Sequence, residues 1–181
     1  MTWAESVQSF WFEDIDPLLW FRADQGFDTV VSDRFLATFE QLATGFDLAA
    51  AVASPVQAVA STIVLDQFPR NMFRGTARAF ATDHLALAVA GAAIAQDLDR
   101  GLDKNRRLFL YLPFEHSEAI AGQRHSVELF RELNDPELLR YAVAHHDIIE
   151  RFGRFPHRNA ILARPSTPEE IEFLKQPGSS F

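Results

Sequence analysis

Helix-start signals recur along this chain, and they constrain its fold more than any other feature of the sequence. At three of the expected helix starts a helix-capping side chain is followed directly by proline: Ser54-Pro55, Asp135-Pro136 and Thr167-Pro168. The capping oxygen accepts hydrogen bonds from the first turn, and proline suits the first helical position, where no N–H donor is needed. Glycines at 45 and 153 provide matching helix ends. A chain punctuated in this way is expected to be helical.

Apolar residues between these signals repeat at the helical period. Val31, Phe35, Phe39 and Leu42 follow one another at intervals of 4, 4 and 3 residues, which places them on one helix face. By contrast, no segment alternates with period two, and no Asn-Gly or Asp-Gly turn joins two β-rich runs. The sequence therefore predicts an all-α fold of about eight helices in antiparallel pairs, joined by short loops.

The expected helices cover most of the chain. Their approximate ranges are 2–12, 28–45, 55–68, 76–100, 103–112, 136–153 and 168–174, with a further helix beginning at 117. Pro69 and Pro113 are each expected to end a helix, because proline removes an N–H donor and clashes with the preceding turn. Residues 1–176 are predicted to form a single domain, followed by a loose tail at 177–181.

The composition excludes several classes of function. The 181 residues include no cysteine, which rules out disulfides, a thiol nucleophile and cysteine-ligated metal sites. With 25 acidic and 17 basic residues, the net charge of −8 argues against general binding to nucleic acid or to an anionic membrane. No basic segment precedes a long apolar run, so neither a signal peptide nor a membrane span is expected. A cytoplasmic protein without a cofactor is predicted.

The negative charge is distributed unevenly. Residues 1–66 hold ten acids and two bases, so the rest of the chain is neutral. Within that rest, arginines gather at 70, 74 and 78 and again at 151, 154, 158 and 164. Of the 17 basic residues 15 are arginine, whose planar fork suits bidentate binding of carboxylate or phosphate. A genome rich in GC codons gives the same bias, and both explanations stay open.

The first motif with more polar residues than a packed helix needs is 65–75 (LDQFPRNMFRG). Gln67 continues the apolar stripe of Val56, Val59 and Ile63, so its amide must find partners inside the fold. Candidate ligand-binding side chains in this motif are Asp66, Gln67, Arg70, Asn71 and Arg74. An equally good explanation is that these side chains form hydrogen bonds that hold the end of a helix in place.

The second motif is 111–118 (YLPFEHSE), where Glu115 and His116 stand side by side. A carboxylate beside an imidazole is suited to acid–base chemistry or to metal binding. Ser117 is more simply explained as a helix cap.

The third motif is 141–149 (YAVAHHDII), which contains His145, His146 and Asp147. At about 100° per residue, His145 falls in the middle of the apolar face of its helix, whereas Asp147 points away. A histidine in that position is more often a core residue than a ligand. The His-Asp pair is typical of metal-dependent phosphohydrolases, but no aspartate follows Asp147, so this interpretation is rejected.

The fourth motif is 151–159 (RFGRFPHRN). Gly153 and Pro156 shape a constrained loop, which is a good platform for polar side chains. The candidates that this loop presents are Arg154, His157, Arg158 and Asn159. Together with His145 they would form a cationic patch for a small anion. Alternatively, the loop forms salt bridges with the acidic N-terminal third.

These motifs also carry a family resemblance. The chain resembles a family of uncharacterised bacterial proteins over nearly its whole length. The residues that carry the resemblance are the first motif, the second motif, the run 145–159 (HHDIIERFGRFPHRN) and the early Phe10-Trp11-Phe12 segment. The resemblance implies an all-α fold similar to tetratricopeptide-like helical arrays. It implies no reaction, cofactor or catalytic residue.

Two functions follow as hypotheses. The first is binding of a small anionic molecule, with or without catalysis, in which the acid–base candidates are His145, His157, Glu115 and His116. The second is a protein-interaction module of the helical-repeat type, without catalysis. A metal site formed by Glu115, His116 and His157 is a weaker third idea, and no metal is predicted. We expect the four motifs to converge on one pocket, because buried Arg, His and Glu side chains need partners.

Overall fold

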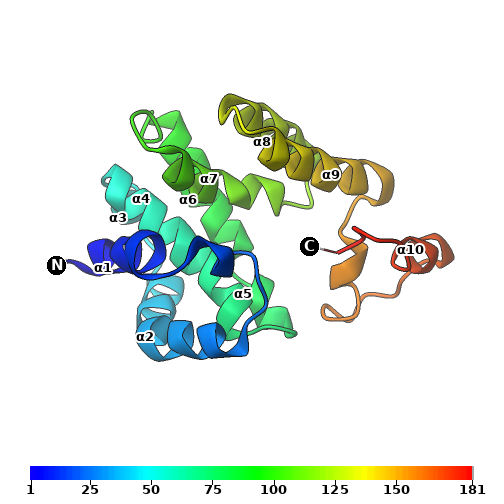
Figure 1. Ribbon diagram of the computed structural model, residues 1–181, viewed down its shortest axis with the longest axis horizontal. Coiled ribbons are helices and arrows are strands. Elements are labelled where there is room, and N and C mark those ends of the chain that lie inside the picture. Colours follow the sequence, from blue (N-terminus) through cyan, green and yellow to red (C-terminus); the bar gives the residue numbers. More distant parts are fainter. Residues whose placement is uncertain (181) are drawn as a thin grey trace. The chain divides into compact units, whose positions relative to one another are not determined.

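The computed structural model describes residues 1–180, and it contains helices and no strand within that range (Figure 1), which confirms the all-α prediction. Its contacts divide the chain into two compact units. Unit 1 comprises residues 1–74 and 78–113, and unit 2 comprises residues 75–77 and the residues from 114 onward. Each unit is described separately. The single domain over residues 1–176 stays a prediction.

Unit 1 is built from the helices of the first two thirds of the chain. These helices are α1 (Trp3–Ser9), α2 (Gln25–Thr44), α3 (Leu48–Ala51), α4 (Pro55–Thr62), α5 (Phe68–Met72), α6 (Asp83–Ala95) and α7 (Lys104–Glu115), the last of which enters unit 2 at its final two residues. Helix α1 packs against α4, α2 against α5, and α6 against α4. Shorter turns of π or 3-10 geometry occupy Phe10–Asp14, Pro17–Leu19, Ile63–Gln67 and Ala77–Phe80.

The core of unit 1 is aromatic. Trp11 is fully buried and meets Phe68 and Phe109 edge to face, with ring centroids 5.6 and 5.4 Å apart. Phe35 stacks on Phe68 at 4.8 Å. Because aromatic rings bury large areas and prefer such offset or edge-on contacts, many of the chain's phenylalanines are explained by packing.

The helix through Pro69 continues where the sequence predicted an end. After α4, the residues Ile63–Gln67 form a π-turn, and α5 then accommodates Pro69 in its first turn. Proline offers no N–H to the carbonyls of the preceding turn. The Thr82 hydroxyl donates to the Leu65 carbonyl at 2.6 Å, and the Arg70 guanidinium donates to the Asp66 carbonyl. Side-chain donors thus bind buried carbonyls in addition to the backbone N–H groups of the helix.

Other helix ends also differ from the expected ones. Helix α7 runs past Pro113 to Glu115, and α2 begins at Gln25, where Asp24 caps it. Helix α6 is shorter than expected and ends at Ala95, close to a left-handed residue at Asp97 (φ 57°). Thr82 precedes the first residue of α6 but does not cap the helix, because the Thr82 hydroxyl donates to the Leu65 carbonyl.

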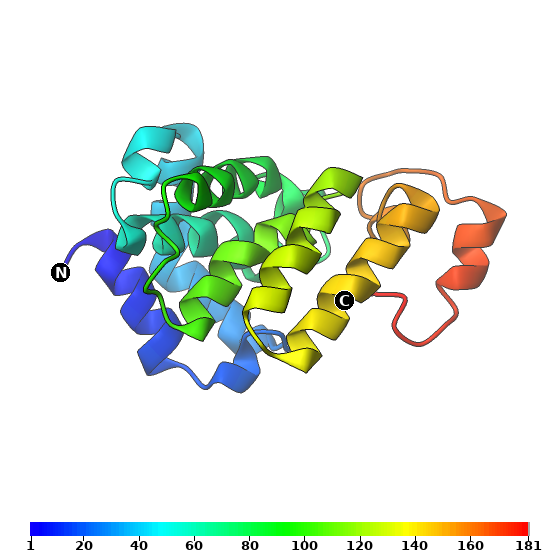
Figure 2. The same cartoon turned by 90° about the horizontal axis from the view of Figure 1, so that it is seen from above.

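Unit 2 is centred on a helical hairpin. Helices α8 (Ile120–Glu132) and α9 (Pro136–Phe152) lie side by side and antiparallel (Figures 1 and 2). As the sequence predicts, Asp135 caps α9 and Gly153 ends it in a left-handed conformation (φ 68°). A 3-10 turn at Pro156–Arg158 follows, and Thr167 begins α10 (Pro168–Phe173) with a reciprocal capping box.

Apolar residues from the hairpin and from the loop after it form a core in unit 2. Ile148, Ile149 and Phe155 are buried, and Phe152 and Phe173 pack against them. In the expected tail, Ser179 is buried and donates to the Leu174 carbonyl, and Phe181 lies outside the described residues. Among the described residues, no helix is both long and apolar enough to cross a bilayer.

Candidate functional site

A buried histidine and a buried glutamate meet in unit 2. Helix α9 turns His145 inward, as its position on the apolar face predicts, and Glu115 lies at the last position of α7. The Glu115 Oε1 atom is 3.4 Å from His145 Nδ1, and both side chains are about 6% exposed. The same Nδ1 atom is 2.9 Å from the Tyr141 carbonyl oxygen. Because a carbonyl only accepts, Nδ1 carries the proton, and Nε2 of the neutral ring carries the lone pair.

Two histidines in this region of unit 2, His145 and His157, have lowered pKa values. Burial lowers the pKa of His145 to about 3, and the charges of His116, Arg158 and His157 act in the same direction. The hydrogen bond to the Tyr141 carbonyl opposes this effect without overcoming it. Burial and the adjacent Arg158 charge likewise lower the pKa of His157 to about 4. Both rings are therefore uncharged at neutral pH.

The buried ring of Phe155 holds the cluster together. The centroids of the His145 and His157 rings each lie 5.6 Å from it, and the guanidinium carbon of Arg158 lies 4.7 Å from it. The His116 ring is 6.4 Å from that of His145. We call the residues Glu115, His116, His145, His157 and Arg158 the histidine cluster. Three of the four motifs thus come together inside unit 2.

Two residues that were not among the sequence candidates fix the loop of the cluster. Glu118 accepts the Phe155 N–H at 2.8 Å, and Arg164 donates to the Phe155 carbonyl at 3.1 Å. The two side chains also pair with each other, at 2.7 and 3.0 Å. The signal for them in the sequence was weak: Glu118 closes the second motif, and Arg164 is one of the clustered arginines.

Arg154 and Asn159, two predicted ligand-binding residues, make bonds within this segment. Arg154 forms a bidentate pair with Glu170 at 2.7 and 2.8 Å, and this pair lowers the pKa of Glu170 to about 2. Asn159 accepts from Arg164 at 3.0 Å and donates to Ser166 at 3.1 Å. Both side chains thus support the loop, and ligand binding by Arg154 and Asn159 stays a prediction.

The first motif lies in unit 1, where carboxylates surround its cations. Arg70 binds Asp83 with both terminal nitrogens, at 2.9 and 3.1 Å, and lies 3.3 Å from an oxygen of the fully buried Asp66. Gln67, the polar residue on the apolar stripe, donates to Asp66 at 2.6 Å. A buried carboxylate is thereby satisfied by an amide and a guanidinium.

The other two candidates of the first motif share one carboxylate. Asp28 accepts from Asn71 at 2.8 Å and from Arg74 at 2.7 and 2.8 Å. Burial alone would raise the pKa of Asp28, but the hydrogen bonds from Arg74 and Asn71 lower it. An external anion would have to compete with these carboxylates, and anion binding by the first motif stays a prediction.

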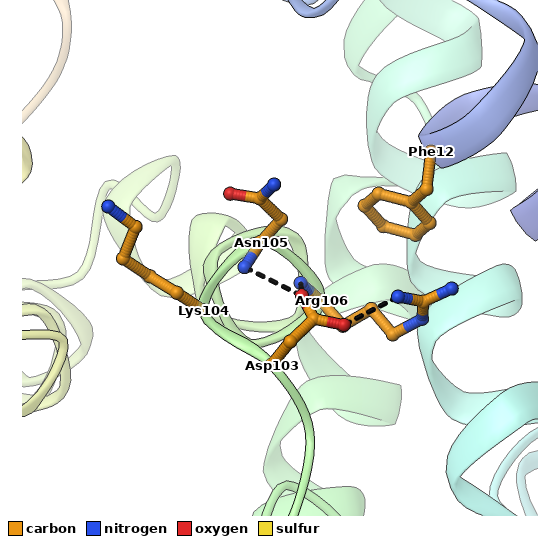
Figure 3. A pocket seen from close by; sticks show the side chains of 5 residues that line it. All are labelled: Phe12, Asp103, Lys104, Asn105 and Arg106. Carbon is orange, nitrogen blue, oxygen red and sulfur yellow. Dashed lines mark hydrogen bonds and ion pairs between the residues drawn. The ribbon is translucent and has the colours of Figure 1, made fainter.

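A surface hollow of about 340 Å³ lies at the start of α7 in unit 1 (Figure 3). The residues that line it are Phe12, Asp103, Lys104, Asn105 and Arg106. Asp103 accepts backbone N–H groups of Asn105 and Arg106, and the Arg106 guanidinium lies 4.7 Å from the Phe12 ring. None of the predicted site residues lines this hollow.

One group of side chains in the described part of the chain has the spacing of metal ligands. On α9, His146, Asp147 and Glu150 each offer one ligand atom, and these atoms lie within 4.8 Å of one another. His146 Nδ1 is 3.2 Å from an Asp147 carboxylate oxygen. Asp147 and Glu150 are exposed and His146 is half-buried, and this group differs from the set of Glu115, His116 and His157 considered from the sequence.

Comparison with known proteins identifies the class to which this all-helical chain belongs. Residues 7–178 match the model of a family described as bacterial proteins of unknown function, DUF924. The chain belongs to this family, which confirms the expected membership in a family of uncharacterised bacterial proteins.

A solved structure supports the fold. A protein of unknown function from Agrobacterium tumefaciens, ATU0120, is 42% identical, with a TM-score of 0.89. The match covers 95% of this chain and 96% of the other. No curated protein shows significant similarity to the chain.

Proposed function

We propose that unit 2 binds a small anionic molecule at the histidine cluster, with His145 as a proton acceptor. The observation that carries this proposal is the packing of His145, His157 and Arg158 around the single ring of Phe155. A packed helical hairpin does not require three histidines and an arginine in one place. Buried polar groups of this kind cost stability unless partners compensate for them, which favours a functional explanation.

Within the cluster, the Arg158 guanidinium is the group that favours an anion. Arg158 is 6% exposed and stays protonated, and its field is little screened at such a position. His145 and His157 are neutral because burial and Arg158 lower their pKa values. A bound anion would offset this repulsion and raise both pKa values, so binding would be accompanied by proton uptake.

The arrangement around His145 suits a general base. The Tyr141 carbonyl holds the proton on Nδ1, which leaves the Nε2 lone pair as the acceptor. When Nε2 takes a proton, the ring becomes a cation, and the Glu115 carboxylate at 3.4 Å from Nδ1 would stabilise it. A carboxylate behind a histidine has this role in many hydrolytic sites.

A thermal-shift screen of anions tests the proposal. We expect inorganic phosphate or a small carboxylate to raise the melting temperature of the wild type, and this rise to disappear in Arg158→Ala. If the alanine variant does not fold, Arg158→Lys is used instead, because it keeps the positive charge but lacks the planar guanidinium group. The matched control is Arg140→Ala on the exposed side of α9, which should keep the full shift. A shift that survives both Arg158 substitutions, or no shift with any anion, would contradict the proposal.

A second candidate is a protein-interaction module resembling tetratricopeptide-like arrays. The observation in its favour is apolar exposure in unit 1, where Leu18 and Phe21 are 77% and 64% exposed on the connection before α2. Exposed apolar side chains that lie close together are typical of binding surfaces. In a pull-down with purified protein, a partner retained by the wild type should be lost by Phe21→Ser. Equal recovery by both proteins would count against this surface.

A further inference from the structure

One ion pair holds the Phe155 residue of unit 2 by both of its backbone polar groups. The Glu118 carboxylate accepts the Phe155 N–H at 2.8 Å, and the Arg164 guanidinium donates to the Phe155 carbonyl at 3.1 Å. The two side chains also pair with each other at 2.7 and 3.0 Å. We call this ion pair, bound to both backbone groups of Phe155, the bracket. A bidentate pair of this kind has a fixed planar geometry, so it defines where Phe155 lies.

The bracket extends to the other end of the loop. The Nε atom of Arg164 donates to the Asn159 side chain at 3.0 Å, and the backbone N–H of Arg164 donates to the Asn159 carbonyl at 2.8 Å. His157 and Arg158 lie between these two fixed points. The backbone that carries both side chains is therefore held on each side by Arg164, together with Glu118 at Phe155.

Exposure of the pair supports a role beyond surface charge. The side chains of Arg164 and Glu118 are 24% and 29% exposed, in contrast to the 49% and 63% of the nearby pair formed by Arg151 and Glu169. Exposed pairs contribute little because water screens them, whereas half-buried bidentate pairs restrict geometry more strongly.

We infer that Glu118 and Arg164 are positioning residues: they set the places of His157 and Arg158 relative to His145. For the ligand, this inference rests on the proposed anion site. The geometric part of the inference rests on Phe155, whose ring contacts the side chains of His145, His157 and Arg158. Without the bracket, the ring and the loop would be free to shift by the fraction of an ångström that binding sites do not tolerate.

The geometric part is tested by NMR on the histidine rings. The ring protons of His145 and His157 experience the ring current of Phe155, so their chemical shifts report its position. We expect these signals to move in Glu118→Gln and in Arg164→Lys, and to stay in place in Glu169→Gln. The control makes the same change of charge and weakens a pair in which two nitrogens of Arg151 donate to one oxygen of Glu169.

The outcomes separate a positioning role from simple stabilisation. Unchanged histidine signals in folded Glu118→Gln and Arg164→Lys would overturn the inference, as would equal movement in the Glu169 control. Arg164→Lys retains a positive charge, so it carries the test if Glu118→Gln does not fold.

Phosphate titration tests the link to binding. We expect Glu118→Gln to bind inorganic phosphate about tenfold more weakly than the wild type, the lower end of the effect of removing second-layer supports of a bound ion. Wild-type affinity in this variant would contradict the positioning role. If the wild type itself does not bind phosphate or carboxylates, the anion proposal fails, whereas the NMR result still decides whether the pair positions the cluster.

Discussion

At the scale of single residues, two opposing effects act on His145. The Glu115 carboxylate at 3.4 Å favours a charged ring, whereas burial disfavours it and the neighbouring cation Arg158 adds repulsion. The ring is 5% exposed, and burial at this depth is the largest of these effects. The neutral base that results is the form a proton acceptor needs at neutral pH.

This burial predicts a dependence of stability on pH. In the unfolded chain the two rings titrate near pH 6.5, but in the folded chain His145 and His157 titrate near 3 and 4. Below pH 6.5 the unfolded state therefore binds protons at these two rings, whereas the native state does not. The free energy of unfolding should fall as the pH falls, by about 1.4 kcal/mol per pH unit for each histidine.

Urea unfolding between pH 5 and 6.5 measures this slope. Carboxylates with lowered pKa values, such as Asp28 and Glu118, lose their contribution only at lower pH, so they do not interfere. In His145→Asn the slope should decrease by the amount of one histidine. An unchanged slope in this variant would show that His145 is not the buried neutral base described here. Above pH 7 both proteins should show no such slope.

At the scale of elements, proline proved to be a weaker stop signal than expected. Pro69 and Pro113 both lie inside continuing helices. At Pro69 the structure supplies what proline removes, because Thr82 and Arg70 donate to carbonyls of the preceding turn. Sequence spacing gives no sign of donors that come from elsewhere, and Thr82 is 17 residues away from Leu65.

Thr82→Val tests this compensation. Valine has nearly the same shape, but it leaves the buried Leu65 carbonyl without its donor, which should lower the free energy of unfolding by about 1–3 kcal/mol. The control is Thr29→Val on α2, whose exposed hydroxyl donates to a carbonyl of its own helix. The control should stay within about 0.5 kcal/mol of the wild type. Equal losses in chemical denaturation would show that the hydroxyl at 82 has no special role.

The three helix starts marked by a cap and a proline, in contrast, could be predicted from local sequence. Ser54, Asp135 and Thr167 each accept an N–H of the following turn, as their pairing with proline indicated. A cap and the N–H that it binds lie within three residues, so the information is contained in the chain itself. Helix ends that depend on distant partners are not encoded in this way.

At the scale of the whole molecule, charges that looked unmatched in the sequence find partners far along the chain. Within unit 1, Arg74 pairs with Asp28 and Arg78 with Glu40, 46 and 38 residues away. The acidic excess of the N-terminal third is thus partly neutralised by the first arginine cluster. The sequence shows that these arginines cluster, but their spacing along the chain does not reveal which distant carboxylates they pair with in the folded protein.

The same limit applies to the candidate site. The inward position of His145 followed from helical geometry, and the structure places His145 there. That Glu115 would lie against His145, and that Phe155 would gather the cluster, depends on how a hairpin and a loop fold onto each other. The sequence likewise contains no sign that Glu170 and Arg164, 16 and 5 positions away, hold Arg154 and Asn159, whose role in ligand binding stays a prediction.

The π-turn at Ile63–Gln67 has a consequence for how this chain can vary in length. A π-turn contains one residue more than an α-turn, so the side chains that follow it are rotated by about 100° relative to an unbroken α-helix. All five of its residues are buried, including Asp66. Deleting one of them would restore regular geometry but turn Arg70 away from Asp83. Natural variants should therefore keep the residue count between Pro55 and Pro69, while exposed connections tolerate insertions.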